Sequence, residues 1–325
     1  MASFSEQSFD AQGYSSNRPS YPPALYSYIA DCTRSPASSS DSPRTVVDLG
    51  CGPGLSSFGF LDHFDSVIGV EPGEGMVQVA REILQQQPKD VQERMRFEQG
   101  TAEDLSLIVK EDASVDLVVA CTSAHWFKDP LAVYRELARV LKPNGSFFFF
   151  TVQTYSTLHF PHKPEFESLL PQFSDEILGP YWSEPGHRIS ETLLAAYPLP
   201  YASNFPDHGV DVTARFDPDT FKRSFFLVSK ETPLPPLIPK EVEREGLEVD
   251  RFDNDPSRML RRIWGLEEVK NLLNTWSASH SWNQAHPGRD CAGEFVERLK
   301  EAGWREGEEH EVVWEIGTLY GRKSN

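Results

Sequence analysis

A glycine-rich turn carries the clearest chemical signal in the sequence. Residues 46–54 read VVDLGCGPG, a D-x-G-x-G-x-G pattern formed by Asp48, Gly50, Gly52 and Gly54. Glycines let a backbone turn sharply and approach a ligand closely, and the amides of a helix that follows can hold a polar group. The last glycine comes too early for the dinucleotide pattern G-x-G-x-x-G, and the Lys-Ser/Thr ending of a phosphate-binding P-loop is missing. The turn therefore suits a nucleoside cofactor that carries an amino acid.

Glu71 is the candidate partner of a ribose. It ends an expected strand at residues 66–71 and lies 71 − 54 = 17 residues after the last glycine. A carboxylate at that strand end accepts hydrogen bonds from both hydroxyls of an adenosine ribose. The alternative is an ordinary exposed glutamate. Residues 100–104, GTAED, follow the next expected strand and lie where the edge of an adenine would be read.

A third group lies in the stretch ACTSAHWF, residues 120–127, directly after an apolar run. Its His125 and Trp126 suit a catalytic base, a metal ligand, the wall of a small-molecule pocket or plain core. A metal is disfavoured because no second His or Cys lies at ligand spacing. The choice among the others depends on what binds at the neighbouring strand ends.

Only a parallel sheet brings these three groups together. Apolar or β-branched runs predict five strands, and amphipathic stretches between them predict helices. The expected strands are residues 44–49, 66–71, 95–98, 115–121 and 146–152, and the expected helices are residues 56–63, 75–87 and 130–141. Strands that alternate with helices indicate an α/β fold with helices on both faces of the sheet. Ligands of such folds bind at the carboxyl ends of the strands, where the three groups lie.

The alternation stops after residue 152, which divides the chain into four parts. Residues 1–43 are expected to form an N-terminal segment that covers the site, and residues 44–152 the cofactor-binding core. Residues 153–288, rich in Pro and aromatic side chains, form a long insert with a mobile loop at 231–256. Residues 289–325 complete the core with a helix at 290–302 and two runs, 310–315 and 318–322, that suit a closing hairpin.

Composition excludes several classes of protein. The formal charge of −18 among 325 residues argues against a nucleic-acid partner, which requires a basic surface. The longest strongly apolar run, 147–152, is far too short to span a bilayer, and the polar start of the chain has no signal-sequence pattern. The four cysteines (Cys32, Cys51, Cys121 and Cys291) are scattered and form no metal-ligand spacing. We expect a cytoplasmic monomer or homodimer without a metal.

The glycine turn, the strand-end acid and the Gly-Thr-Ala-Glu turn together resemble the class I S-adenosylmethionine (SAM) dependent methyltransferases over residues 44–152 and 289–322. The resemblance implies a Rossmann-like fold with a seven-stranded, mostly parallel sheet, a closing antiparallel hairpin strand and an insert after the fifth strand. It implies SAM as the cofactor. The cofactor contacts that it implies are Tyr21, Asp48, Gly50, Gly52, Gly54, Glu71, Pro72, Met76, Ala102, Glu103, Cys121 and Thr122.

Several further stretches resemble the fungal trans-aconitate 3-methyltransferase group. They are YSSNRPSYP (14–22), AHWF (124–127), GPYWSEPGHR (179–188), TWSASHSW (275–282) and EVVWEIGTLYGRK (311–323). This narrower resemblance implies a small polar acid as the methyl acceptor. Two departures from the group are a longer segment at 231–262 and Glu71-Pro72-Gly73 in place of Asp-Leu-Ser.

The expected acceptor site combines aromatic rings with cationic side chains. Aromatic faces exclude water and attract a sulfonium by about 0.5–2 kcal/mol. The candidates for this contact are Trp126, Tyr181, Trp182, Trp276, His280 and Trp282. Arg18 and Arg188 suit a bidentate pair with a carboxylate. The alternatives are a core for the insert and, for the arginines, surface salt bridges.

The role of His125 depends on the acceptor. A phenol or an amine needs a general base, whereas a carboxylate is already ionised at pH 7, and His125 would then orient or neutralise it. We expect methyl esterification of a carboxylate such as that of trans-aconitate. An O- or N-methyltransferase of fungal secondary metabolism and a SAM-binding protein without methyl transfer remain as alternatives.

Overall fold

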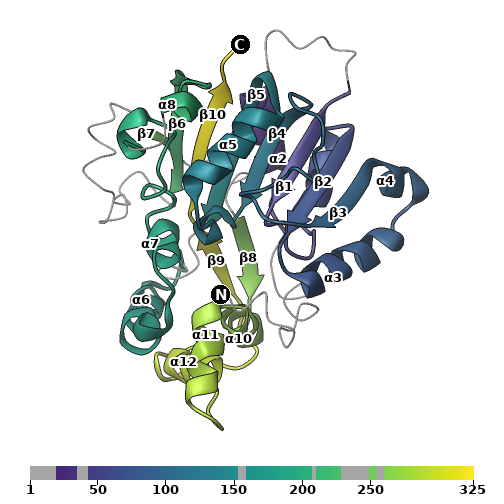
Figure 1. Cartoon of the computed structure of the whole chain (residues 1–325). Coiled ribbons are helices and arrows are strands. Elements are labelled where there is room, and N and C mark those ends of the chain that lie inside the picture. The colour runs from purple at the N-terminus through teal and green to yellow at the C-terminus, as the bar shows by residue number, and fades with distance from the viewer. Residues whose placement is uncertain (1–19, 35–42, 153–158, 207–209, 228–248, 254–259) are drawn as a thin grey trace.

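The computed structural model describes residues 20–34, 43–152, 159–206, 210–227, 249–253 and 260–325 (Figure 1). Arg18 and most of the expected mobile loop at 231–256 lie outside these ranges. No helix in the described ranges is long and apolar enough to cross a membrane.

One large sheet organises the chain. Its strands are β1 (Thr45–Leu49), β2 (Ser66–Glu71), β3 (Met95–Gln99), β4 (Val115–Cys121), β5 (Leu141–Val152), β6 (Phe216–Leu227), β7 (Val249–Asp253) and β10 (Ile316–Lys323). Their order across the sheet is β3-β2-β1-β4-β5-β10-β6-β7. Strand β10 runs antiparallel to both of its neighbours, and the other pairs are parallel. The expected α/β sheet with one antiparallel strand is thus confirmed, and β7 adds an eighth strand at its edge.

Helices cover both faces of the sheet because the central strands are apolar on both sides. One face packs against α2 (Pro23–Thr33), the 3-10 helix η2 (Ser57–Asp62) and α3 (Glu74–Gln85). The other packs against α5 (Pro130–Val140) and α8 (Val210–Thr213). In β5 the run Phe147–Phe150 sends alternate rings into the two cores. The short helix α4 (Lys89–Arg94) leads into β3.

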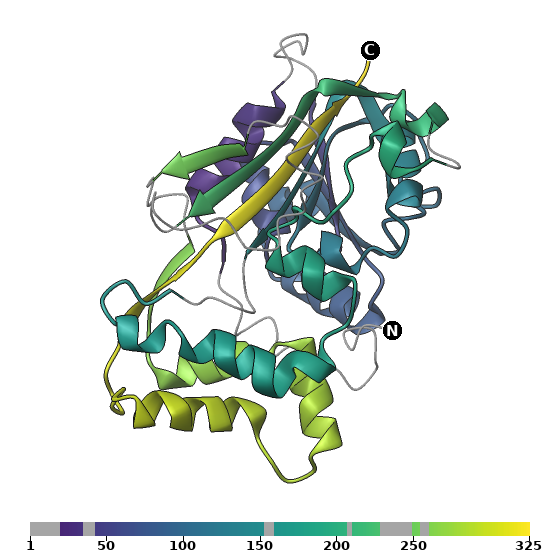
Figure 2. The same cartoon turned by 90° about the vertical axis from the view of Figure 1, so that its left-hand side faces the viewer.

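A second, smaller unit stands at the lower end of the sheet in Figures 1 and 2, and we call it the helical subdomain. It consists of α6 (Leu169–Phe173), η5 (Ser174–Leu178), α10 (Leu266–Asn274), α11 (Ser277–Ala285), α12 (Cys291–Glu301) and a two-stranded sheet of β8 (Leu260–Trp264) and β9 (His310–Trp314). Its core is rich in large rings, among them Trp276, Phe295 and Trp304. The short helix η4 (Pro164–Phe166) precedes α6. The short helices η6 (Gly179–Tyr181), α7 (Gly186–Glu191) and η7 (Ala202–Asn204) lie between η5 and β6.

The structure revises the boundaries expected after residue 152. Strand β6 lies within the expected insert but pairs with β10 in the main sheet. Strand β7 lies within the expected mobile loop and pairs with β6. The expected closing hairpin does not form, because β9 pairs with β8 while β10 pairs with β5 and β6. Helix α12 packs on α10, α11 and α6 and so belongs to the helical subdomain. Periodicity shows where strands occur, and distant partners decide where they pair.

Candidate active site

The glycine turn leaves β1 in a conformation that only glycine adopts without strain. Gly50 and Gly54 have φ angles of +66° and +83°. A Cβ atom at Gly50 would lie 2.6 Å from the Cβ of Ser123, and one at Gly54 would lie 2.5 Å from the ring of Phe97. Gly52 also has a positive φ, but a Cβ there would meet no atom within 4 Å. The turn is therefore packed at both ends and open in the middle, where a ligand can approach the backbone.

Glu71 lies at the carboxyl end of β2 and fixes the open middle of the turn. Its Oε2 accepts a hydrogen bond of 3.0 Å from the backbone N–H of Gly52, and its Oε1 accepts one of 2.9 Å from that of Gly73. Burial raises the pKa of the Glu71 carboxyl, and these two hydrogen bonds oppose the rise. Each carboxylate oxygen keeps a further lone pair, so Glu71 can accept hydrogen bonds from a ligand while it holds the turn.

Asp48 holds the turn from the opposite side. It is fully buried in β1, and its Oδ2 accepts hydrogen bonds from the hydroxyls of Ser56 at 3.0 Å and Ser57 at 2.7 Å. Burial raises its pKa to about 6, although the two serines oppose the rise. The structure thus gives Asp48 a position behind the turn, where it supports the residues that contact a ligand.

The end of β4 supplies the other wall. Thr122 follows the strand with a φ of +55°, and its hydroxyl lies 2.8 Å from the hydroxyl of Tyr21. Tyr21 in turn packs edge-to-face on Phe150, with ring centroids 4.8 Å apart. The thiol of Cys121 lies beside Asp48, and burial raises its pKa well above the usual range, which keeps it neutral. Tyr21 therefore places part of the N-terminal segment beside the ends of β4 and β5.

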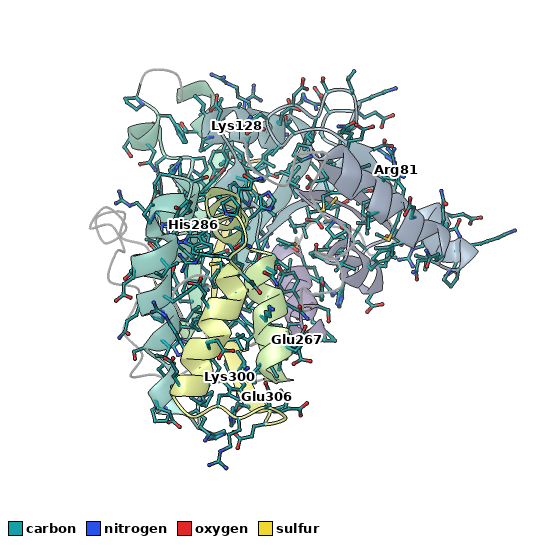
Figure 3. All side chains as sticks on the ribbon, turned by 90° about the horizontal axis from the view of Figure 1, so that it is seen from below. Arg81, Lys128, Glu267, His286, Lys300 and Glu306 are labelled. Atoms are coloured by element: carbon teal, nitrogen blue, oxygen red, sulfur yellow. The ribbon has the colours of Figure 1, made fainter. Side chains whose placement is uncertain are left out.

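A cavity opens between this edge of the sheet and the helical subdomain. Its walls are Ser20, Tyr21, Gly50, Cys51, Gly52, Pro53, Leu55, Ser56, Cys121, Thr122, Val152, Leu260, Leu272 and Trp314. The cavity brings together the expected Tyr21, Gly50, Gly52, Cys121 and Thr122. No residue on this list is charged. The subdomain's charged side chains Glu267, Lys300 and Glu306 gather at one end of that unit, with His286 toward the other (Figure 3).

Sequence reasoning missed the apolar half of this cavity. Val152 ends β5, whereas Leu260, Leu272 and Trp314 come from β8, α10 and β9 of the helical subdomain. These residues are buried leucine, valine and tryptophan, which occur in every core. The pairing of β8 with β9 sets Leu260 opposite Trp314, and the folded chain places both in the cavity with the glycine turn.

His125 and Trp126 lie in the short helix η3 (Ala124–Trp126), next to the site but not in the described lining of the cavity. His125 is 5% exposed, and its ring lies 4.9 Å from that of Trp126. Helix α7 packs directly on it, because a Cβ at Gly186 would lie 2.7 Å from the His125 carbonyl oxygen. This position favours orientation or packing over direct proton transfer.

The expected acceptor residues of the insert lie in two places. One group is Tyr181, Trp182 and Arg188, near η6 and α7, and the other is His280 and Trp282, on α11. Trp182 stacks on His187 at 5.0 Å, and Tyr181 contacts His286. Trp282 is 4% exposed, and it stacks on His286 at 4.1 Å and packs under Arg289. His280 lies 2.9 Å from the amide nitrogen of Gln284, and Arg188 is exposed on α7. None of these residues lines the described cavity, and the surroundings of Trp182 and Trp282 are those of a core.

The remaining expected cofactor residues surround β2 and β3. Met76 is buried in α3, Pro72 is exposed, and Ala102 is buried in the turn after β3. Glu103 accepts a 2.8 Å hydrogen bond from the backbone N–H of Lys128, which links the turn after β3 to the segment after η3. Among the described residues, no cluster of His, Cys, Asp and Glu suits a metal ion.

Comparisons with known proteins agree with this geometry. The family model described as a methyltransferase domain matches residues 47–149. The Saccharomyces cerevisiae protein CRG1, described as a probable S-adenosylmethionine-dependent methyltransferase, is 25% identical over 92% of this chain and 90% of its own. The uncharacterized methyltransferase YcgJ of Bacillus subtilis is 40% identical, but over only 31% of this chain and 38% of its own.

A solved structure from Anaeromyxobacter dehalogenans, described as a candidate type II methyltransferase, has the same fold. It covers 94% of this chain and 97% of its own, at a TM-score of 0.61 and 23% identity. The strand order, the glycine turn, the strand-end acid and the matched domain all lead to one assignment. The chain is a SAM-dependent methyltransferase, and its match to the methyltransferase domain spans residues 47–149.

Proposed function

We propose that this enzyme methylates a small molecule that binds between the carboxyl edge of the sheet and the helical subdomain. The observation that carries the proposal is the shared cavity, because the glycine turn forms one wall while Leu260, Leu272 and Trp314 form the opposite one. A methyl donor held at the turn would thus face an acceptor held by the subdomain. Bound SAM supplies a methyl group activated by the positive sulfur.

The residues present fit the cofactor. The open space at Gly52 admits a ligand against the backbone, and Glu71 offers carboxylate lone pairs beside it. Tyr21 and Thr122 offer two adjacent hydroxyls for polar groups of the amino-acid part. Cys51 and Cys121 are buried and neutral, so they close the site without competing as nucleophiles.

Two classes of acceptor remain. A small polar acid, methylated on a carboxylate like that of trans-aconitate, is supported by the five stretches that resemble that group of enzymes. A neutral hydroxyl or amine compound is supported by the lining of the cavity, which in the described ranges has no charged side chain. We propose the acid first, because the resembling stretches span nearly the whole chain.

A transfer screen decides between them. The intact protein is incubated with methyl-labelled SAM and a panel of polycarboxylates, phenols and amines, and products are identified by mass spectrometry. Labelled methyl esters of an acid would support the first class, and labelled ethers or N-methyl amines the second. Binding of SAM without transfer to any compound of the panel would contradict the proposal of a small-molecule acceptor.

A further inference from the structure

Strand β8 places a cationic side chain at the edge of the cavity. Leu260 and Trp314 are directly opposite each other in the β8–β9 pair, and both line the cavity. Side chains two residues apart on a strand share a face. Arg262 therefore extends from β8 on the same face as Leu260, toward the cavity side of this small sheet.

The guanidinium of Arg262 reaches the N-terminal segment that closes the cavity. One of its nitrogens donates a 2.5 Å hydrogen bond to the carbonyl oxygen of Ser20 and lies 3.4 Å from the Ser20 hydroxyl. The other terminal nitrogen donates to the carbonyl oxygen of Arg261 at 2.7 Å. Since Ser20 is itself part of the cavity wall, the positive charge of Arg262 lies at the rim of the cavity.

Arg262 has no carboxylate partner in the described part of the chain. Its neighbour Arg261 pairs with Glu311 at 2.8 Å, but the contacts of Arg262 are to neutral oxygens alone. Arg262 is half-buried, and burial lowers its pKa without an opposing contribution from any acidic group. A half-buried guanidinium without an anion is unexpected in a chain with a net charge of −18. It keeps donor capacity for an anion, and arginine binds carboxylates in bidentate geometry.

We propose that Arg262 binds a carboxylate at the rim of the cavity. The inference rests on the proposed function and deepens it, because it gives the site the anion-binding group that its uncharged walls lack. Two carboxylates have the required chemistry, one on an acidic acceptor and one on the amino-acid part of the cofactor.

The test compares Arg262→Gln and Arg262→Lys with the control Arg261→Gln. Arg261 is next in sequence, half-buried and already paired with Glu311, so its substitution removes the same charge without removing the proposed site. Calorimetry measures binding of S-adenosylhomocysteine, which has the carboxylate, and of 5′-methylthioadenosine, which lacks it. Kinetics measure KM and kcat for the acid that the transfer screen identifies.

Each result has a defined meaning. If the acceptor supplies the carboxylate, Arg262→Gln raises its KM about 10- to 100-fold, Arg262→Lys raises it less, and binding of both nucleosides is unchanged. If the cofactor supplies it, Arg262→Gln weakens the binding of S-adenosylhomocysteine by a similar factor but leaves the binding of 5′-methylthioadenosine unchanged.

Equal behaviour of Arg262→Gln and Arg261→Gln in all three measurements overturns the inference. So does a wild-type enzyme that methylates only neutral compounds, if S-adenosylhomocysteine binding is also unaffected. A wild-type protein that binds neither nucleoside would instead contradict the proposed function.

Discussion

At the scale of single residues, we propose that Glu71 both holds the glycine turn and binds the cofactor. Its oxygens already hold the N–H groups of Gly52 and Gly73, and the ribose of the cofactor would add to these contacts. A carboxylate that is fixed before the ligand arrives loses little conformational entropy on binding.

Replacement of this carboxylate should therefore weaken cofactor binding. We predict that Glu71→Ala weakens the binding of S-adenosylhomocysteine by about 1–3 kcal/mol. The ribose loses a charged hydrogen-bond acceptor, and the turn loses its hydrogen bonds to Glu71. Calorimetry measures the change. Glu74→Ala, an exposed carboxylate at the start of α3, is the matched control and should bind like the wild type. Equal affinities for the two variants would exclude the ribose role of Glu71.

His125 tests the chemistry of the acceptor. With a carboxylate acceptor no proton moves, so His125→Asn should lower the single-turnover rate at saturating SAM and acceptor by less than about tenfold. The position of His125 under α7, outside the described cavity lining, leads to the same expectation. A loss of about 10²–10⁴-fold, together with the disappearance of a pH dependence near neutrality, would instead identify a general base and a hydroxyl or amine acceptor.

The residue types differ in how far sequence alone predicts them. The glycines and Glu71 could be predicted because a turn and a strand-end acid require these residue types at that spacing. Trp182 and Trp282 could not be assigned, because a buried aromatic ring looks the same in a core and in a pocket. Arg262 belongs to none of the sequence motifs that predicted the site. Its position at the cavity follows from the pairing of β8 with β9.

At the scale of elements, the turn between β1 and η2 depends on its packing against β3. We predict that Gly54→Ala lowers the free energy of unfolding by about 2–4 kcal/mol, because the new Cβ meets the Phe97 ring and the φ of +83° is unfavourable for alanine. Gly75→Ala, where a Cβ meets nothing within 4 Å at the start of α3, is the control and should be neutral or slightly stabilising. Urea unfolding compares them, and equal midpoints would contradict this view of the turn.

A partly buried ionic group joins the segment after β5 to the β9–β10 junction. The backbone of His159 exchanges two hydrogen bonds with Val313, and its ring lies 3.2 Å from Glu167 and 3.5 Å from Glu315. Although burial lowers the pKa of His159, hydrogen bonds and charges of Glu167 and Glu315 raise it to about 9. The folded protein therefore holds this proton more tightly than the unfolded chain.

This contact predicts a dependence of stability on pH. Its contribution of about 1–3 kcal/mol is fully present below the unfolded pKa of about 6.5 and is lost as pH rises through about 9. Urea unfolding at several pH values should show this loss in the wild type and in the control His162→Gln, whose imidazole is 80% exposed. His159→Gln should remove that part of the pH dependence. If the unfolding free energies of His159→Gln and the wild type changed with pH in parallel, the ion group would contribute nothing to the pH dependence of stability.

The elements show why the first half of the chain was easier to predict than the second. Strands β1 to β5 and their helices follow one another along the chain between residues 45 and 152, so local periodicity was enough to predict them. Strand β6 begins at Phe216, far from that regular pattern, and β8 pairs with β9 about 50 residues later in the chain. Such distant pairings leave no local pattern in the sequence.

At the scale of the whole molecule, the active site lies between two units. The sheet supplies the glycine turn after β1 and the ends of β4 and β5, and the helical subdomain supplies Leu260, Leu272 and Trp314. The cofactor half could be predicted because its motif is local, whereas the acceptor half is assembled from β8, α10 and β9. This division explains why the sequence names the cofactor with more certainty than the acceptor.

We propose that the cavity beside the glycine turn binds SAM. The most direct test is isothermal titration of the purified wild-type protein with SAM and with S-adenosylhomocysteine, with Glu71→Ala and Glu74→Ala titrated in parallel. We predict binding in the micromolar range by the wild type and by Glu74→Ala, and weaker binding by Glu71→Ala. A folded wild-type protein that takes up neither compound would contradict the account.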